Sequence, residues 1–262
     1  MPIPRHPAKH GSPAHFNPED HLDYFRNVGL APGSLQPAAA IFCYQRTLLR
    51  HVVDTEQPSR IPCVTGMLYP LPSTGGSVVL AAEFGIGAPA AAMTMELLVA
   101  MGVRRFINIG TAGGLTPNLT VGDLTICTSA IRDEGVSHHY LADPHAPALP
   151  THQLTEDFAA ALHQHGLTPP RGSTWTTDAP FRETRAEIAH YQQEGVLTVE
   201  METAALFAVA NLRQVEIAAG FVISDVLSGE AWNPQFRAAE TARGLVSLFE
   251  AARATLTETP VP

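Results

Sequence analysis

Six segments typical of buried β-strands alternate with helical segments along this chain of 262 residues. The expected strands are rich in β-branched and other apolar residues and cover residues 38–44, 77–84, 104–110, 123–131, 195–201 and 216–225. Helical spacing marks residues 88–102, 154–166, 202–213 and 235–256. Strands with few polar positions indicate a sheet that is covered on both faces. The pattern therefore predicts an α/β fold, a single domain with a mixed, mostly parallel central sheet flanked by helices.

The N-terminal residues differ in composition from the rest of the chain. Residues 1–15 are rich in proline and histidine and show no periodicity, so residues 1–35 are expected to form an extension that is partly mobile. The histidines in it lack the regular spacing of metal ligands, and no metal site is expected. No linker, repeat or low-complexity tract divides residues 36–262. That part is expected to form one catalytic domain.

Composition and charge exclude several classes of partner. The formal net charge is −9 and no basic run is present, which argues against nucleic acid and anionic membranes. No apolar run reaches the roughly 18 residues of a membrane helix, and no signal-peptide pattern is present. The three cysteines, Cys43, Cys63 and Cys127, lack a CxxC spacing and are expected to be reduced. A cytoplasmic protein is the resulting expectation.

Polar and flexible residues follow four of the predicted strands. The segments are GIGAPA at 85–90, GTAGGL at 110–115, VEMET at 199–203 and ISDVLSGEAW at 223–232. In open α/β sheets the carboxyl ends of the strands meet at one edge, where ligands bind. The sequence therefore predicts a binding pocket at this edge of the sheet.

The first of these segments matches the G-x-G-x-x-A pattern of a dinucleotide site through Gly85, Gly87 and Ala90. Such a site also requires an acidic residue about 20 positions later, at the end of the next strand. The next strand, residues 104–110, offers none. This argues against a nicotinamide cofactor.

The second segment, GTAGGL, is expected to form a glycine-rich turn after its strand. Gly110, Gly113 and Gly114 let a backbone approach a ligand closely. Their amides and the Thr111 hydroxyl can hold an anion. A tight turn without a ligand fits the same residues equally well.

The last two segments place carboxylates beside the core. Glu200 and Glu202 close an apolar strand, where a carboxylate needs hydrogen bonds such as those of a sugar diol. A glutamate favoured by the dipole of a helix N-terminus is the alternative for Glu202. Asp225 ends the most apolar strand, where a carboxyl group can act as a general acid. An N-cap or turn aspartate is the alternative there.

Together and in this order, GTAGGL, VGD at 121–123, VEMET and ISD resemble the nucleoside phosphorylase family. That family includes uridine phosphorylases, hexameric purine nucleoside phosphorylases and methylthioadenosine nucleosidases. The resemblance implies phosphorolysis of a nucleoside N-glycosidic bond to free base and ribose 1-phosphate, with inorganic phosphate as co-substrate and no cofactor. It also implies a homo-oligomer built on dimers, in which the N-terminal segment can complete a neighbour's site.

The resemblance also implies roles for individual residues. Asp225 would protonate the leaving base, and Glu202 would hold the ribose hydroxyls. Uridine-cleaving members usually lack an acid at the position of Asp225, so a purine is slightly favoured over uridine. The remaining implied contacts are Glu200 and Met201 in the sugar wall, Trp175 and Phe181 near the base, and Gly110, Thr111, Gly85 and Arg46 near phosphate.

Two departures from the family pattern concern phosphate. Family phosphorylases carry an arginine at the position of Asn108 and a Gly-Asp-Pro loop after the first strand, where this chain reads CYQRTLLR. Asparagine cannot supply the charge of an arginine–phosphate fork. Either Arg46, Arg50, Arg60 or a neighbouring subunit supplies it, or water replaces phosphate, with Glu83 as a candidate base. The alternatives are a phosphate-independent nucleosidase of the same fold and a non-catalytic nucleoside-binding protein.

Overall fold

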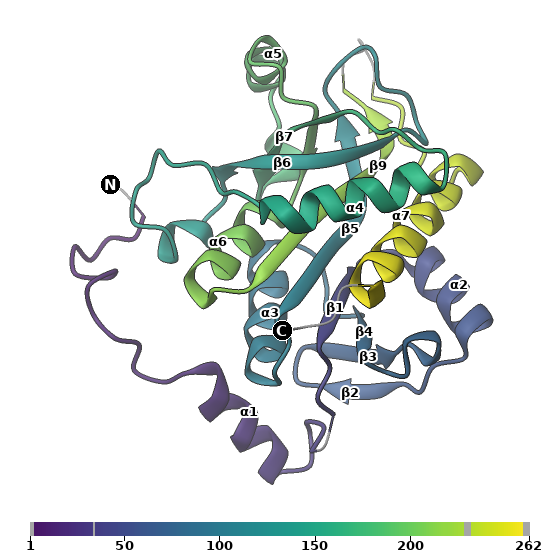
Figure 1. Ribbon diagram of the computed structural model, residues 1–262. Helices are drawn as coiled ribbons and strands as arrows, with labels where there is room; N and C mark the ends of the chain where they lie inside the picture. The colour runs from purple at the N-terminus through teal and green to yellow at the C-terminus, as the bar shows by residue number, and fades with distance from the viewer. Residues whose placement is uncertain (1–2, 34, 228–231, 259–262) are drawn as a thin grey trace.

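The computed structural model describes residues 3–33, 35–227 and 232–258. A nine-stranded sheet in the order β2-β3-β4-β1-β5-β8-β7-β6-β9 forms its centre (Figure 1). The strands are β1 (Ala39–Cys43), β2 (Ile61–Cys63), β3 (Gly66–Pro70), β4 (Val78–Ala82), β5 (Arg105–Gly114), β6 (Leu124–Asp133), β7 (Arg171–Thr177), β8 (Thr198–Glu200) and β9 (Glu216–Val226). The helices are α1 (Pro18–Asn27), α2 (Arg46–Glu56), α3 (Ala88–Ala100), α4 (His152–Gln164), α5 (Arg185–Gln193), α6 (Thr203–Arg213) and α7 (Ala239–Glu258).

The sheet is mixed. β1 pairs in parallel with β4 and β5, β5 with β9, and β7 with β6 and β8. Antiparallel pairs join β2 to β3, β3 to β4, β5 to β8 and β6 to β9. Because β9 pairs with both β6 and β5, strands β5, β8, β7, β6 and β9 close on one another. The expected α/β fold with a mixed, mostly parallel central sheet is confirmed.

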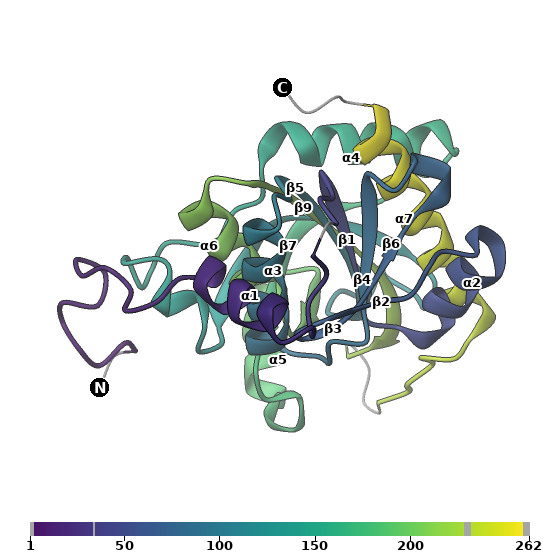
Figure 2. The same cartoon turned by 90° about the horizontal axis from the view of Figure 1, so that it is seen from below.

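Helices cover the sheet on two sides. Figure 2 shows α3 and α6 on one side and α4 and α7 on the other. One buried cluster joins α3 and α6 to residues of β1 and β5 such as Phe42 and Phe106. A second cluster joins α2, α4 and α7 to the alternate residues of the same strands, such as Ile41 and Ile107. All five residues of β1 are buried because both faces of the strand are covered.

The expected turn at residues 110–114 is wrong. β5 continues through Gly114, with a register shift between Ala112 and Gly113 where it pairs with β9. A Cβ at Gly113 would lie 2.3 Å from Leu227 Cδ1 and 3.1 Å from Val199 Cγ1. Glycine here leaves room for the side chains of neighbouring segments, and it does not mark a turn.

The predicted strands and helices all appear, and several further elements were not predicted. The strand expected at 195–201 is shorter in the structure, where only β8 is present, because α6 begins shortly after β8. The unpredicted elements are the hairpin of β2 and β3, strand β7, and helices α1, α2 and α5. Each is short or rich in polar residues, so its apolar pattern is weak.

The described residues of the N-terminal extension form no helix or strand before α1. α1 packs on α3 through the buried Leu22. The described cysteines are free thiols, two of them buried. Among the described residues, no helix is long and apolar enough to cross a membrane.

Candidate active site

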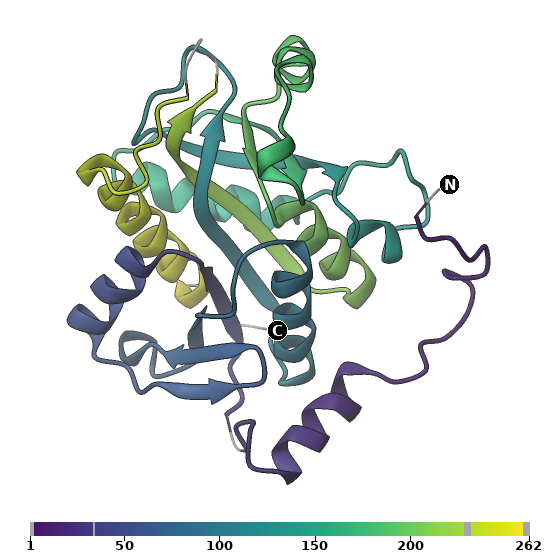
Figure 3. The ribbon, with the colours of Figure 1, turned by 180° about the vertical axis from the view of Figure 1, so that it is seen from behind.

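A cavity of about 820 Å³ opens where β5, β8 and β9 end, at the end of the sheet from which α5 projects (Figure 3). Its size is within the range of small-molecule pockets. The walls come from residues 110–113 of β5, residues 199–202 at the start of α6, the end of β9 and the segment 180–192. The carboxyl ends of the strands thus meet at one pocket, as the sequence predicts.

Glu200 is buried, and its carboxylate is fully used by protein donors. Oε2 accepts hydrogen bonds from the backbone N–H groups of Glu202 and Thr203, both at 2.8 Å, and from the Thr203 hydroxyl at 2.7 Å. Oε1 accepts from the Thr176 hydroxyl at 2.5 Å. Burial raises the pKa of Glu200, and these bonds oppose the rise. Glu200 caps the N-terminus of α6, so its carboxylate has little capacity left for a substrate.

Glu202 precedes the first residue of α6 and faces the cavity. One of its carboxylate oxygens accepts a hydrogen bond of 2.5 Å from the backbone N–H of Gly87. Gly87 has a φ of 95°, which favours glycine. The GIGAPA loop therefore holds a carboxylate, which explains its glycine pattern without a dinucleotide. Burial, and then the charge of Glu200, raises the pKa of Glu202 to about 8.

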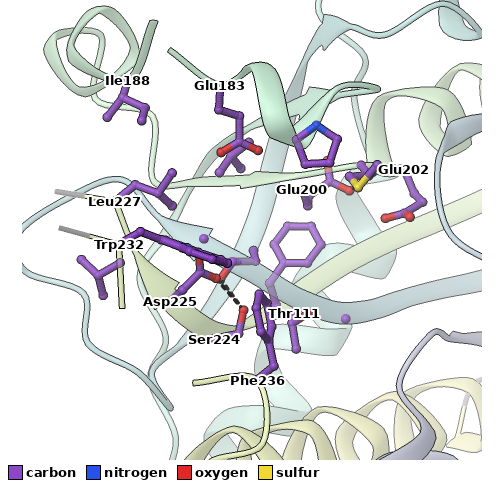
Figure 4. A pocket seen from close by; sticks show the side chains of 18 of the residues that line it. Thr111, Glu183, Ile188, Glu200, Glu202, Ser224, Asp225, Leu227, Trp232 and Phe236 are labelled. Carbon is purple, nitrogen blue, oxygen red and sulfur yellow. Dashed lines mark hydrogen bonds between the residues drawn. The ribbon is translucent and has the colours of Figure 1, made fainter. Parts of the chain in front are cut away.

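Asp225 lies at the end of β9 and is 7% exposed. The Ser224 hydroxyl donates to Oδ1 at 2.8 Å, and the Trp232 indole donates to Oδ2 at 2.7 Å. Figure 4 shows the Trp232 ring lying across this carboxylate. Residues 228–231, which belong to the predicted segment after this strand, lie outside the described residues.

Glu183 also faces the cavity, although it was not predicted as a site residue. It follows a short 3₁₀ helix, Pro180–Arg182, and points towards the cavity from the side opposite Asp225 (Figure 4). Burial, and then the charges of Asp225 and Glu187, raises its pKa to about 7. The segment around it is polar and largely exposed, so no pattern of the sequence distinguishes Glu183 from a surface glutamate.

Asn108 is buried, and both ends of its amide are used within the protein. Its Oδ1 accepts from the Tyr44 hydroxyl at 2.8 Å, and its Nδ2 donates to the Thr203 hydroxyl at 3.1 Å. Next to it, Gln45 Nε2 donates to the Thr111 hydroxyl at 3.1 Å. Tyr44 and Gln45 both line the cavity and were not predicted as site residues. A polar residue in this apolar strand is therefore explained by the hydrogen-bond network around it.

Most of the predicted site residues lie at the cavity. Those that line it are Gly110, Thr111, Phe181, Glu200, Met201, Glu202 and Asp225. Phe181 is fully exposed, at a position where its ring contacts little of the described protein.

Three predicted contacts are not met, because Trp175, Gly85 and Arg46 do not line the cavity. Trp175 is 1% exposed; its indole donates to Asp133 at 2.9 Å and its ring packs on Tyr191. A tryptophan held in the core in this way cannot stack on a base. The polar residues around it in the sequence gave no means of separating these two roles.

The candidate base Glu83 also lies outside the cavity lining. Its carboxylate accepts from the Tyr69 hydroxyl at 2.6 Å and pairs with Arg60 at 3.2 Å. The hydrogen bond from Tyr69, and then those from Arg60, lower the pKa of Glu83. Because the Glu83 carboxylate is already hydrogen-bonded and lies away from the cavity, it is not placed to activate water there.

The charges of the cavity are mainly negative. Its described lining includes the carboxylates of Glu183, Glu200, Glu202 and Asp225, and its one cationic side chain is Arg185 of α5. Within the described part of the chain, no group of three or more histidine, cysteine, aspartate or glutamate side chains could hold a metal ion.

Comparison with known proteins agrees with these features. The family model described as the phosphorylase superfamily matches residues 33–254. A uridine phosphorylase from Haemophilus influenzae is 29% identical over 150 residues, which cover 52% of this chain and 59% of the relative. A guanosine phosphorylase from Halorubrum lacusprofundi is 30% identical over 139 residues, which cover 53% and 57%.

A DeoD-type purine nucleoside phosphorylase from Caldanaerobacter subterraneus is 31% identical over 156 residues, which cover 58% of this chain and 67% of the relative. The matches to the uridine and guanosine phosphorylases thus span less than two thirds of those proteins' length. The family model, in contrast, spans the whole sheet and every helix except α1 and the last residues of α7. The chain therefore belongs to the phosphorylase superfamily.

Proposed function

We propose that the protein cleaves the N-glycosidic bond of a nucleoside and releases the free base, with a purine favoured. The observation that carries this proposal is that Glu202 and Asp225 face one cavity from different walls (Figure 4). Glu202 can accept hydrogen bonds from sugar hydroxyls, and once ionised it can stabilise positive charge on the ribose. Asp225 can give a proton to the leaving base. Met201, next to Glu202 in the sequence, also lines the cavity and can supply apolar contact for the sugar.

Phosphate is one candidate for the nucleophile. The names of the relatives support it, because the uridine, guanosine and purine nucleoside enzymes are all phosphorylases. The hydroxyl of Thr111 and the backbone of Gly110 line the cavity and can contact an anion. Phosphorolysis would give the free base and ribose 1-phosphate, with phosphate as the co-substrate and no other cofactor.

Water is the second candidate, and the surroundings of Asn108 favour it. This residue stands where family phosphorylases have an arginine, its amide is neutral, and both of its ends are bound within the protein. Hydrolysis would release free ribose.

The proposed assembly is a homo-oligomer built on dimers. Exposed apolar side chains on and next to α1 support it, since Phe16, Tyr24, Val28 and Leu30 are each at least half exposed. Light scattering of the full chain tests this, and a monomer at all concentrations would contradict it.

Base release from adenosine, inosine, guanosine, uridine and methylthioadenosine, with and without phosphate, tests the proposed function. We expect purine nucleosides to be cleaved faster than uridine. A nucleoside that raises the melting temperature without release of base would instead indicate a non-catalytic binding protein. No release and no binding would contradict the proposal.

A further inference from the structure

We infer that the nucleophile position of this cavity is built for water and excludes phosphate dianion, and that Tyr44 is the residue that determines this preference. The inference rests on the proposed cleavage of a nucleoside. The Tyr44 ring lies against Gly110, where a Cβ on the glycine would be 3.5 Å from Tyr44 Cδ2. Tyr44 therefore lies beside Gly110 and Thr111, the residues expected to contact an anion.

A chain of hydrogen bonds fixes the direction in which the Tyr44 hydroxyl points. The chain begins at Glu200 Oε2, which accepts from two backbone N–H groups and from the Thr203 hydroxyl. Because the Thr203 proton is used on this carboxylate, its oxygen can only accept from Asn108. The amide nitrogen of Asn108 must then face Thr203, and its oxygen must face Tyr44. Tyr44 consequently donates its only proton to Asn108.

At the cavity end of this series of hydrogen bonds, the Tyr44 hydroxyl can accept a hydrogen bond but has no proton left to donate. The Tyr44 oxygen keeps its lone pairs, and its proton is held by Asn108. Burial, and then the charges of Glu202 and Glu200, raise the pKa of Tyr44 well above its ordinary value, so the proton stays in place. In the residue after Tyr44, Gln45 Oε1 is buried without a hydrogen-bond partner among the described residues. This oxygen adds negative potential to the same part of the cavity.

The Tyr44 and Gln45 oxygens distinguish water from phosphate by charge and by hydrogen bonding. Water is neutral and can donate a proton to the Tyr44 oxygen while it accepts from the Thr111 hydroxyl. A phosphate dianion would place charged oxygens against acceptors, in a cavity whose described lining carries four carboxylates and a single arginine. Desolvating such an anion without a matching cation is costly.

The hydrolytic step balances without another reactant. The bond from the anomeric carbon to the base nitrogen breaks, and its electron pair leaves with the base, which takes a proton from Asp225. The water oxygen bonds to the anomeric carbon and becomes a protonated hydroxyl, which loses its extra proton to solvent. Asp225 regains its proton from solvent, so one nucleoside and one water give one base and one free ribose.

Turnover in ¹⁸O-labelled water, with and without excess phosphate, tests the inference. We expect the same rate in both, with the label in free ribose. Tyr44→Phe keeps the ring and removes the acceptor oxygen, and it should lower kcat about tenfold or more while KM for the nucleoside changes little. Tyr140→Phe, at a tyrosine outside the cavity lining, is the matched control. Phosphate-dependent release that gives ribose 1-phosphate would overturn the inference and leave the proposed cleavage intact.

A second measurement decides the inference even if no nucleoside is cleaved, an outcome that would contradict only the proposed function. Calorimetric titration of the full chain with inorganic phosphate, against chloride of equal ionic strength, should show no saturable binding. Saturable phosphate binding that Thr111→Val abolishes would overturn the inference.

Discussion

The indole Nε1 of Trp232 donates a hydrogen bond of 2.7 Å to Oδ2 of Asp225, the carboxylate proposed to protonate the leaving base. An indole N–H can only donate, so Oδ2 must be an acceptor in this arrangement. A proton on Asp225 would therefore reside on Oδ1, and the Ser224 hydroxyl, 2.8 Å away, would then accept from it. Because Trp232 is 62% exposed, the group that orients the acid also forms part of the open side of the cavity.

Replacing Asp225 by asparagine should lower base release at least about tenfold, because an amide cannot transfer a proton to the leaving base. Steady-state rates with a purine nucleoside measure the effect. Nucleoside affinity should change much less than kcat. An unchanged kcat would remove Asp225 from the proposed acid role.

Trp232 should report nucleoside binding by its fluorescence. The chain has two tryptophans, and Trp175 is buried away from the cavity lining, so a bound base should change mainly the emission of Trp232. Trp232→Phe keeps an aromatic ring but loses the donor to Asp225. That variant should lose the fluorescence change and most of the activity that depends on an oriented Asp225. A full signal in the variant would show that the base binds elsewhere.

Glu200 and Glu202 should respond differently to replacement by glutamine. In Glu200→Gln an amide N–H₂ group would face donors that now bind a carboxylate, and we expect a loss of about 1–3 kcal/mol of stability. Glu202→Gln should fold normally and lower base release about tenfold or more, since its carboxylate is proposed to stabilise charge on the sugar. The melting temperature and the rate of base release, measured for both variants, separate the helix-capping role of Glu200 from the proposed role of Glu202 in catalysis. Equal effects on stability and rate in the two variants would contradict this assignment.

Stability should fall with rising pH because of the cavity carboxyl groups. The pKa of Glu202 is raised to about 8 and that of Glu183 to about 7, so the folded state holds protons that the unfolded state has released. The contribution of these two carboxyl groups to the free energy of unfolding is fully present below the ordinary glutamate pKa of about 4.3. It is lost as the pH rises to the pKa values of the folded state.

Glu202→Gln and Glu183→Gln should each reduce the fall in melting temperature between these limits. Glu19→Gln, at an exposed glutamate of α1, is the control and should leave the pH dependence unchanged. A wild-type melting temperature that rises over this range would contradict the assignment of both groups.

The sequence predicted what depends on apolar periodicity and on motif order, and missed what depends on contacts between distant segments. Buried strands such as β1 and β9 show their pattern directly. The segment 110–114 was misjudged because glycine serves both turns and close strand packing, and only the neighbouring Leu227 distinguishes the two. Trp175 was misplaced because a core tryptophan and a base-stacking one have the same local sequence.

The roles of Tyr44 and Glu183 could not be predicted for the same reason. Tyr44 acquires its role from Asn108, 64 positions away in the sequence. Glu183 acquires its raised pKa from burial and from the charge of Asp225. Neither contact leaves a local pattern in the chain.

Gly66 provides a test of how the strand ends support the cavity. A Cβ on this residue would lie 2.6 Å from Ala82 O and 2.8 Å from Phe84 N, both backbone atoms at the end of β4. Backbone atoms cannot rotate away as a side chain can, so Gly66→Ala must shift β3 against β4, at a cost of about 1–3 kcal/mol. The shifted segment leads within a few residues to Gly87, whose N–H binds Glu202. We therefore expect lower thermal stability together with a lower rate of base release.

Gly11→Ala is the matched control, because a Cβ there meets no atom within 4 Å. It should leave both the melting temperature and the rate unchanged. A Gly66→Ala variant that melts earlier but keeps the wild-type rate would show that the loop holding Glu202 tolerates movement at the end of β4. A wild-type melting temperature would show that β3 separates from β4 without cost, which the antiparallel pairing of Met67 with Ala82 argues against.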